Sequence, residues 1–329
     1  MTDSPEQMVA EAERAGALLA RARAEIGKTI FGQERVIELV LAGMLAGGHV
    51  LLVGAPGLAK TKLVQAVATV MGLDWGRVQF TPDLMPADIV GSEILDQDAS
   101  GSRSFRFVPG PIFTRLLMAD EINRASPRTQ SALLQAMQER QVTVAGQAYA
   151  LPEPFHVLAT QNPIEHEGAY PLPEAQLDRF LLQVDVPYPD AETERRILIE
   201  TTGLAEQHPE RVLDAASLIA LQQLVRRMPV GEKVLAAIIE LVRSARPGAS
   251  PDPRVNQHVA WGPGPRAGQA LMLAVRARAL LRGRLAPALD DVVALARPAL
   301  VHRMALSFGA RAEGLGVEDL VDDLASKAA

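Results

Sequence analysis

The 329-residue sequence contains no cysteine. This absence excludes disulfide bonds, thiolate metal sites and cysteine nucleophiles together, and it fits a reducing compartment. A surplus of basic residues is missing too, because 33 Lys and Arg stand against 39 Asp and Glu, which gives a formal charge of −6. Since a general nucleic-acid binder neutralises phosphates with Lys and Arg, the acidic balance disfavours that class.

Long apolar runs are also missing. The most hydrophobic segment, residues 37–53, is interrupted by Gly47, Gly48 and His49. It therefore predicts a helix, a turn and a strand rather than a membrane span of ~20 apolar residues. The first residues have neither the basic start nor the apolar stretch of a signal peptide. We therefore expect a cytoplasmic protein with no membrane span.

The residues that are present are typical of a folded protein. Hydrophobic residues make up 48% of the chain and charged residues 22%, which excludes wholesale disorder. The length suits about two domains, each large enough to bury its own core. Composition alone gives no indication of the chemistry.

Short apolar runs alternate with helical stretches over the first 190 residues. This alternation predicts a parallel sheet with helices on both faces, that is, an α/β fold. Two segments of alternating residues predict β-hairpins inserted into that layout, at about 92–108 around a polar tip at 98–101, and at about 142–151. The expected strands are 50–53, 78–80, 116–119, 155–159 and 181–184, and the clearest helices are 6–27, 34–45, 61–71 and 127–140.

The pattern changes after Pro187-Tyr188-Pro189. The remainder has helical periodicity and almost no strand-like runs, with a loop at 246–264 that is rich in Pro and Gly. We expect a domain boundary near Asp190. Residues 1–190 would form the α/β domain with its N-terminal helix, and residues 191–329 an all-α domain.

The strongest local motif is Gly54-Ala55-Pro56-Gly57-Leu58-Ala59-Lys60-Thr61. A glycine-containing loop between strand and helix lets backbone N–H groups and the helix N-terminus converge on phosphate oxygens. Lys60 would reach the β- and γ-phosphates, and the Thr61 hydroxyl would bind Mg²⁺. The general pattern has Gly where this chain has Ala59, and we expect alanine there to keep a negative φ. The alternative is an ordinary strand-to-helix turn.

Two further expected strands end in polar residues. Asp120 and Glu121 follow the apolar run 116–119. Asp120 would hold Mg²⁺, and Glu121 would polarise the attacking water. Asn162 follows 155–159 and would hold the water or the γ-phosphate. The alternatives are a solvated acidic turn and an Asn-Pro turn.

Arginines form a further group of candidates. Arg179 either makes a surface ion pair or acts on a neighbouring subunit's phosphate. Arg266, at the start of an expected helix, is either simply exposed or projects onto the nucleotide. For Arg276, Arg278, Arg282 and Arg284 we expect a solvated face with ion pairs rather than a nucleic-acid stripe. The six histidines have no metal-binding spacing.

The order of these parts resembles that of an AAA+ ATPase. The residues within the motifs resemble those of the MoxR family more closely still. The similarity runs from about residue 30 to about residue 307. The family shares Ala59 and both inserted hairpins. The resemblance rests on the segments Gly57–Thr61, Ala119–Ala125, Ala159–Pro163, Tyr170–Phe180 and Gly262–Ala267.

The resemblance implies a role for each candidate. Lys60 and Thr61 would be the Walker A pair, and Asp120 and Glu121 the Walker B pair. The other implied roles are sensor 1 for Asn162, a trans-acting arginine finger for Arg179 and sensor 2 for Arg266, with Arg124 as a second trans-acting residue or a solvated one. The nucleotide-binding set would comprise Gly32 and Gln33 on the adenine side, together with Gly54, Ala55, Pro56, Gly57, Leu58, Ala59, Lys60, Thr61 and Lys62.

The family also implies the activity: Mg²⁺-dependent hydrolysis of ATP to ADP and phosphate at the subunit interfaces of a ring, with a hexamer expected. The resemblance further implies a chaperone-like protein that remodels or matures protein complexes, or inserts a metal or cofactor into them. It would work with a von Willebrand factor A domain partner. A nucleic-acid motor of the helicase type is the alternative, since such motors carry hairpins at the same places and Arg103 and Arg106 flank Phe105. A nucleotide-gated scaffold is a third, against which Glu121 argues.

Overall fold

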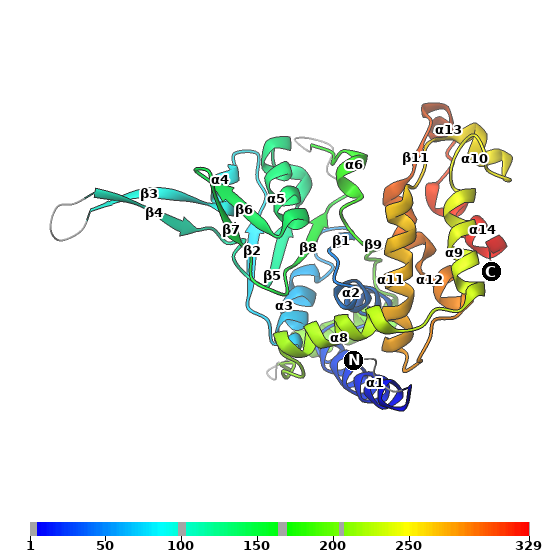
Figure 1. Ribbon diagram of the computed structural model, residues 1–329, viewed down its shortest axis with the longest axis horizontal. Coiled ribbons are helices and arrows are strands. Elements are labelled where there is room, and N and C mark those ends of the chain that lie inside the picture. The colour runs from blue at the N-terminus through cyan, green and yellow to red at the C-terminus, as the bar shows by residue number, and fades with distance from the viewer. Residues whose placement is uncertain (1–4, 98–102, 164–169, 204–206, 329) are drawn as a thin grey trace.

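The computed structural model describes residues 5–97, 103–163, 170–203 and 207–328. Its centre is a five-stranded parallel sheet in the order β2-β5-β8-β1-β9 (Figure 1). Leu116, Leu117 and Met118 are completely buried, as expected for a strand covered on both faces. The strands are β1 (Val50–Val53), β2 (Trp75–Gln79), β5 (Leu116–Asp120), β8 (His156–Gln161) and β9 (Leu182–Asp185).

Helices cover both faces of the sheet, which confirms the predicted α/β layout. Successive strand residues point to opposite faces. Leu52 and Leu116 therefore enter one core and Leu51 and Leu117 another. The first core contains α1 (Pro5–Gly27), α2 (Glu34–Leu45) and α3 (Lys60–Met71), and the second contains α4 (Pro86–Val90) and α5 (Pro127–Glu139).

Two antiparallel hairpins extend from this body, at the places that the sequence predicts. The longer pairs β3 (Gly91–Gln97) with β4 (Arg103–Pro109) and forms a projecting arm (Figure 1), and its predicted tip at 98–101 lies outside the described residues. The shorter pairs β6 (Gln141–Val144) with β7 (Gln147–Ala150). Phe107 and Tyr149 stack at 3.9 Å between ring centroids and join the two. At the base of the arm Gly91 has φ +93°, and a Cβ there would lie 2.3 Å from the Val108 carbonyl oxygen, so only glycine fits.

The chain after β9 is a helical lid, with one small departure from the prediction. The expected loop at 246–264 contains α10 (Pro253–His258) and β10 (Val259–Trp261), which pairs with β11 (Ala305–Leu306). Strands of two or three residues are too short to leave an alternating pattern. The main helices are α7 (Ala191–Thr201), α8 (Ala215–Arg227), α9 (Glu232–Ser244), α11 (Pro265–Leu281), α12 (Leu289–Leu300), α13 (Phe308–Ala312) and α14 (Val317–Ala328), with short turns at η1 (Ile122–Arg124), α6 (Glu174–Leu177) and η2 (Val301–Arg303).

The lid packs directly onto the α/β body. One hydrophobic core continues from α2 and α3 into α8, α9, α11 and α12. Within the described parts of the chain, no helix is both long and apolar enough to cross a membrane.

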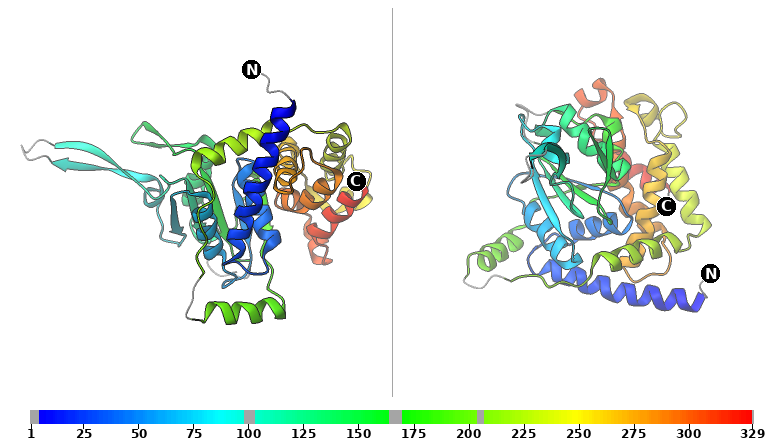
Figure 2. Two further views of the ribbon diagram at one scale, coloured as in Figure 1. Left: turned by 90° about the horizontal axis from the view of Figure 1, so that it is seen from below. Right: turned by 60° about the vertical axis from the view of Figure 1, so that its left-hand side comes forward.

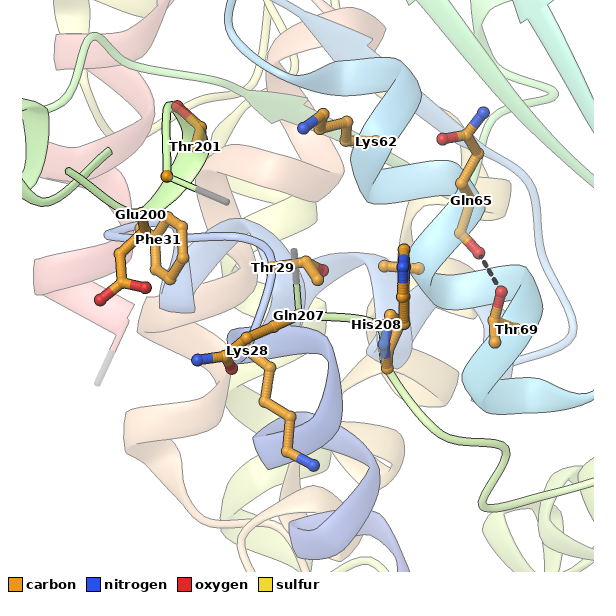
Figure 3. Close-up of a pocket in the computed structure, with 13 residues that line it drawn as sticks. Lys28, Thr29, Phe31, Lys62, Gln65, Thr69, Glu200, Thr201, Gln207 and His208 are labelled. Carbon is orange, nitrogen blue, oxygen red and sulfur yellow. Dashed lines mark hydrogen bonds between the residues drawn. The ribbon is translucent and has the colours of Figure 1, made fainter. Parts of the chain in front are cut away.

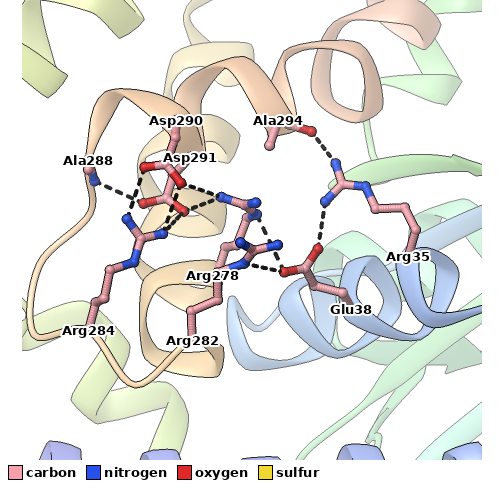
Figure 4. Close-up of polar contacts among 9 residues, drawn as sticks. All are labelled: Arg35, Glu38, Arg278, Arg282, Arg284, Ala288, Asp290, Asp291 and Ala294. Atoms are coloured by element: carbon pink, nitrogen blue, oxygen red, sulfur yellow. Dashed lines mark hydrogen bonds and ion pairs between the residues drawn. The ribbon is translucent and has the colours of Figure 1, made fainter.

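An ion-pair cluster also joins the lid to α2 (Figure 4). Glu38 accepts a 2.8 Å hydrogen bond from Arg282, and Asp291 accepts one of 2.6 Å from Arg284. Arg278 pairs with both acids while its side chain is only 6% exposed. The expected solvated arginine face is therefore wrong for Arg278, because this side of α11 packs against α2 and α12. Burial raises the pKa of Glu38, but hydrogen bonds from Arg282 and Arg35 outweigh burial and leave the pKa lowered.

Candidate nucleotide-binding site

Strands β1, β5 and β8 are neighbours, so the polar residues that follow them meet at one edge of the sheet. This carboxyl edge is where ligands bind in open α/β sheets. A cleft of about 500 Å³ lies there. It is lined by Gln33, Pro56, Gly57, Leu58, Ala59, Lys60, Thr61, Lys62, Asp120, Glu121 and Asn162 among the predicted residues, and by Thr29, Ile30, Phe31, Thr160, Pro189, Ile197 and Thr201.

The loop between β1 and α3 has a left-handed backbone at two points. Gly57 has φ +83°, and Ala59 has φ +57°. The expectation of a negative φ at Ala59 is wrong. Ala59 is the N-cap of α3, and its carbonyl accepts the first helical hydrogen bond from the Leu63 amide at 2.9 Å. Left-handed backbone costs an L-residue roughly 1–2 kcal/mol, which the surrounding structure must offset.

Lys60 begins α3, so it stands where the positive end of the helix dipole meets the cleft. Its ammonium donates to the carbonyl of Gly54 and, at 3.2 Å, to that of Ala55. Gly54 and Ala55 therefore form the loop that holds the lysine, and neither lines the cleft. This geometry keeps a positive charge at the mouth of an anion-binding loop.

Asp120 is held by two neighbours that the sequence did not reveal as site residues. Arg77 of β2 lies 2.5 Å from its Oδ2, and the Thr160 hydroxyl donates to its Oδ1 at 2.6 Å. The same hydroxyl accepts a hydrogen bond from the Glu121 amide at 2.8 Å. Thr160 thus joins the ends of β5 and β8 and fixes the two acids relative to each other.

Glu121 has φ +55°, again in the left-handed region. Its Oε2 accepts hydrogen bonds from the side-chain amide of Gln79 at 2.7 Å and from the Arg124 guanidinium at 3.0 Å. Arg124 therefore pairs with Glu121 of its own chain. Asn162, which is 5% exposed, lies just after the neighbouring strand β8 and lines the same cleft.

The far wall of the cleft is built by the segment before α2 and by α7. Phe31 stacks under the Arg196 guanidinium, with 4.5 Å from its central carbon to the ring centroid. Gly32 does not line the cleft, but it has φ +67°, and a Cβ there would lie 2.4 Å from Thr193 of α7. The position therefore requires glycine because α7 approaches so closely.

A second cavity of about 410 Å³ adjoins this wall (Figure 3). It shares Thr29, Phe31, Lys62 and Thr201 with the first, so the two cavities are adjacent. Its lining includes Lys28 after α1, Gln65 and Thr69 of α3, Glu200 of α7 and His208 after α7 (Figure 3).

Arg179 and Arg266 do not line the cleft. Arg266 Nη1 lies 3.6 Å from Asp178 Oδ2, and that carboxylate also binds the buried Arg303, with Oδ1 2.6 Å from its Nε. Arg179 is the next residue and makes no side-chain hydrogen bond or ion pair with any described residue. The start of α11 therefore lies beside the end of α6, and α8 packs against both α2 and α11.

Comparisons with known proteins agree with this geometry. Residues 49–182 match the ATPase family associated with various cellular activities (AAA), and residues 252–324 match the AAA lid domain. The chain is 41% identical to the chaperone MoxR1 of Mycobacterium tuberculosis, over 92% of this chain and 80% of that protein. It is 33% identical to the protein MoxR of Methylorubrum extorquens, over 87% of each. This chain belongs to the MoxR family of AAA+ ATPases.

A solved structure supports the fold of this MoxR-family ATPase over its whole length. A Cytophaga hutchinsonii protein described as a candidate ATPase superposes with a TM-score of 0.89 at 35% identity, covering 98% of this chain and 97% of that one. The family and the AAA+ fold predicted from the sequence are therefore confirmed, and the protein is an ATPase.

Proposed function

We propose that this MoxR-family ATPase works in the cytoplasm as a ring, with a hexamer expected, and hydrolyses ATP with Mg²⁺ at the interfaces between subunits. The observation that carries the proposal is the separation of the machinery. One cleft gathers Lys60, Asp120, Glu121 and Asn162, whereas Arg179 and Arg266 lie together outside it. Two arginines that do not line their own cleft are suited to serve a neighbour's.

The roles within the cleft follow from the contacts. Glu121 would orient the attacking water, and Gln79 and Arg124 hold its carboxylate. Asn162 would hold the water or the γ-phosphate, and Lys60 would contact the β- and γ-phosphates. The backbone from Pro56 to Thr61 would bind the phosphates, with Phe31 and Gln33 on the base side.

The residues present suit a magnesium ion that is bound jointly with the nucleotide. No cluster of three or more His, Cys, Asp or Glu that could hold a metal occurs in the described part of the chain. Thr61 and Asp120 supply one hydroxyl and one carboxylate, and Mg²⁺ commonly takes its other ligands from phosphate and water. When bound, the ion would offset negative charge on the phosphates.

Subunit mixing tests the interface mechanism. Arg179→Ala subunits keep an intact cleft, and Lys60→Ala subunits keep an intact arginine. Each variant alone should lose roughly 10³-fold or more in turnover. An equimolar mixture should regain a fraction of the wild-type rate, because some interfaces then combine an intact cleft with an intact arginine. If Arg179→Ala alone remains fully active, the interface mechanism is wrong.

For the biological role we propose remodelling or maturation of protein complexes, including metal or cofactor insertion, with a von Willebrand factor A domain partner. The relative named as a chaperone supports this role. So does the projecting arm, where Leu95 and Phe105 are paired across the strands and are 55% and 72% exposed. A purified von Willebrand factor A protein encoded beside this one should bind the ring and change its ATPase rate. Absence of binding would contradict this part of the proposal.

The helicase-type alternative has weaker support. Arg106 forms a 2.9 Å ion pair with Asp96, and it alternates with Phe105 along β4, so the two side chains point to opposite faces of the arm. Salt-sensitive binding of single strands that stimulates ATP hydrolysis would favour this alternative.

A further inference from the structure

We propose that α7 of one subunit docks into the groove between α9 and α11 of the next subunit. The proposal rests on the ring proposed above and identifies the helix and the groove that would join its members. It also connects the base-side wall of one nucleotide cleft to the lid of its neighbour.

The lining of the groove combines apolar and basic side chains. It has a volume of about 720 Å³ and includes Ile239, which is 50% exposed. Arg226, Arg243 and Arg246 line it, and none of them forms an ion pair with a described residue. The rest of the lining consists of Leu235, Ile238, Val242, Pro265, Gly268, Gln269, Met272 and Leu273, with no Asp or Glu among the described residues. Arg246 does donate a 2.9 Å hydrogen bond to the Pro263 carbonyl, so what the three arginines lack is an acidic partner. An apolar groove with such arginines fits an amphipathic helix flanked by acids.

Helix α7 has this character. None of its eleven residues is buried, and Leu198 and Ile199 are 65% and 60% exposed. Glu192 and Glu194 flank these two on the helix surface. Arg195 lies on the same face. In the docked arrangement its partner would be Glu240 of α9, which lines a second depression together with Arg243. A helix that exposes adjacent large apolar residues normally covers them against another element.

The other face of α7 is already in use. Ile197 and Thr201 line the nucleotide cleft, and Arg196 stacks on Phe31. The helix is therefore fixed to its own cleft and offers Leu198 and Ile199 outward.

The placement of Arg266 brings the two surfaces together. Pro265 and Gly268, on either side of Arg266 at the start of α11, line the groove. If Arg266 reaches the phosphates of the next subunit, the groove must face the wall of that cleft, which α7 forms. In the left view of Figure 2, α7 (green) stands out at one edge of the molecule, and α8 and α9 lie toward the opposite edge. Opposite faces give a head-to-tail contact, the type that forms a ring when the rotation between subunits closes.

Cross-linking tests the contact directly, because the chain contains no cysteine. Subunits with Leu198→Cys and subunits with Ile239→Cys are mixed with nucleotide and treated with a short thiol-to-thiol reagent. We expect a covalent dimer on a denaturing gel for this mixture and for neither variant alone. The control pairs Leu198→Cys with Val293→Cys, which is 41% exposed on α12 outside the groove, and should give no dimer.

Charge reversal adds a second measurement. Arg243→Glu should weaken subunit association by about tenfold in sedimentation experiments, and adding Glu194→Arg should restore much of it. If rings assemble and the Arg179/Lys60 mixture regains activity while Leu198 and Ile239 do not cross-link, the docking is wrong and the ring mechanism stands. If the cross-link forms but the mixture regains nothing, the docking stands and the arginine mechanism is wrong. If no ring forms, both are overturned.

Discussion

Ala59 and Glu121 both line the nucleotide cleft and have left-handed backbones, at φ +57° and +55°. Such conformations cost an L-residue about 1–3 kcal/mol and persist only where neighbours enforce them. At Glu121 the neighbours are visible, since Thr160 holds the amide and Gln79 and Arg124 hold the carboxylate. At Ala59 the start of α3 enforces the turn.

Replacing Ala59 tests this geometry. Glycine adopts the left-handed region without steric cost but has more freedom when unfolded, so Ala59→Gly should change the free energy of unfolding by less than about 1 kcal/mol. Ala59→Val should destabilise the protein by more than about 1 kcal/mol and weaken nucleotide binding, because a β-branched residue fits this region poorly. Urea unfolding and titration with a fluorescent nucleotide measure both effects.

The matched control is Ala236→Gly in the interior of α9. It should cost about 1 kcal/mol, the usual helical penalty. If Ala59→Gly destabilises as much as this control, the left-handed assignment is wrong.

Glu121 carries a separate prediction at this scale. Glu121→Gln keeps the shape of the side chain and removes the charge that would orient water. We expect nucleotide affinity within about threefold of wild type and turnover reduced by at least ~10²-fold. Gln79→Ala leaves the carboxylate but removes one of its hydrogen bonds, so its loss of turnover should be smaller. Unchanged turnover in Glu121→Gln would remove Glu121 from its assigned role.

At the scale of elements, the sequence predicts those helices and strands that a local pattern of apolar residues marks. Helix α2 and strand β1 lie at their predicted residues, because an apolar run or a helical period marks each. Arg77, Gln79 and Thr160 were missed as site residues because their role depends on strand order. Gln79 lies opposite Asp120 only because β2 is the neighbour of β5 in the sheet. A single sequence does not show which strands are neighbours.

Arg278 shows the same limit for helices. Its spacing on α11 suits a solvated face, yet contact with α2 and α12 buries it among Glu38, Asp290 and Asp291. Asp291 is fully buried, and it also accepts a 2.9 Å hydrogen bond from the Ala288 amide at the start of α12. The cluster therefore fixes the lid against the body (Figure 4).

Breaking this cluster should be costly. Asp291→Asn leaves the buried Arg278 without its closest acid, and we expect a loss of about 3–5 kcal/mol in the free energy of unfolding. The control is Asp322→Asn, whose 2.7 Å pair with Arg297 is exposed and should be worth no more than about 1 kcal/mol. Urea unfolding of both variants measures the difference. Equal effects would show that the cluster adds nothing beyond a surface pair.

At the scale of the whole molecule, the path of the chain decides where function can occur. The motifs predict which arginines matter, but their position depends on α8 crossing the body and carrying α11 to the side of α6. Long-range packing of this kind leaves no periodic signal in the sequence. The same packing places three histidines in the interior.

Two of these histidines, His49 and His156, accept a hydrogen bond at a ring nitrogen, which only the neutral ring can do. His49 accepts a 3.0 Å hydrogen bond from the Val157 amide, and His156 accepts one of 3.0 Å from Gln222. Burial, followed by the repulsion from His156, lowers the pKa of His49 to about 3, and burial lowers the pKa of His156 to about 4. Burial and then the neighbouring Arg303 lower the pKa of His302 well below its usual value.

These shifts predict how stability depends on pH. Below about pH 6.5 the unfolded chain binds protons that the folded protein rejects, so the free energy of unfolding should fall as the pH decreases. Each of the three histidines contributes up to about 1.4 kcal/mol per pH unit between pH 6.5 and pH 5, a window in which ordinary carboxylates stay ionised. Urea unfolding at pH 8, 7, 6 and 5 measures the slope. His156→Gln should make the slope shallower by one proton, and its effect at pH 8 gives the part that is independent of protonation. A slope that is unchanged in His156→Gln would mean that His156 takes up its proton in the folded protein as well.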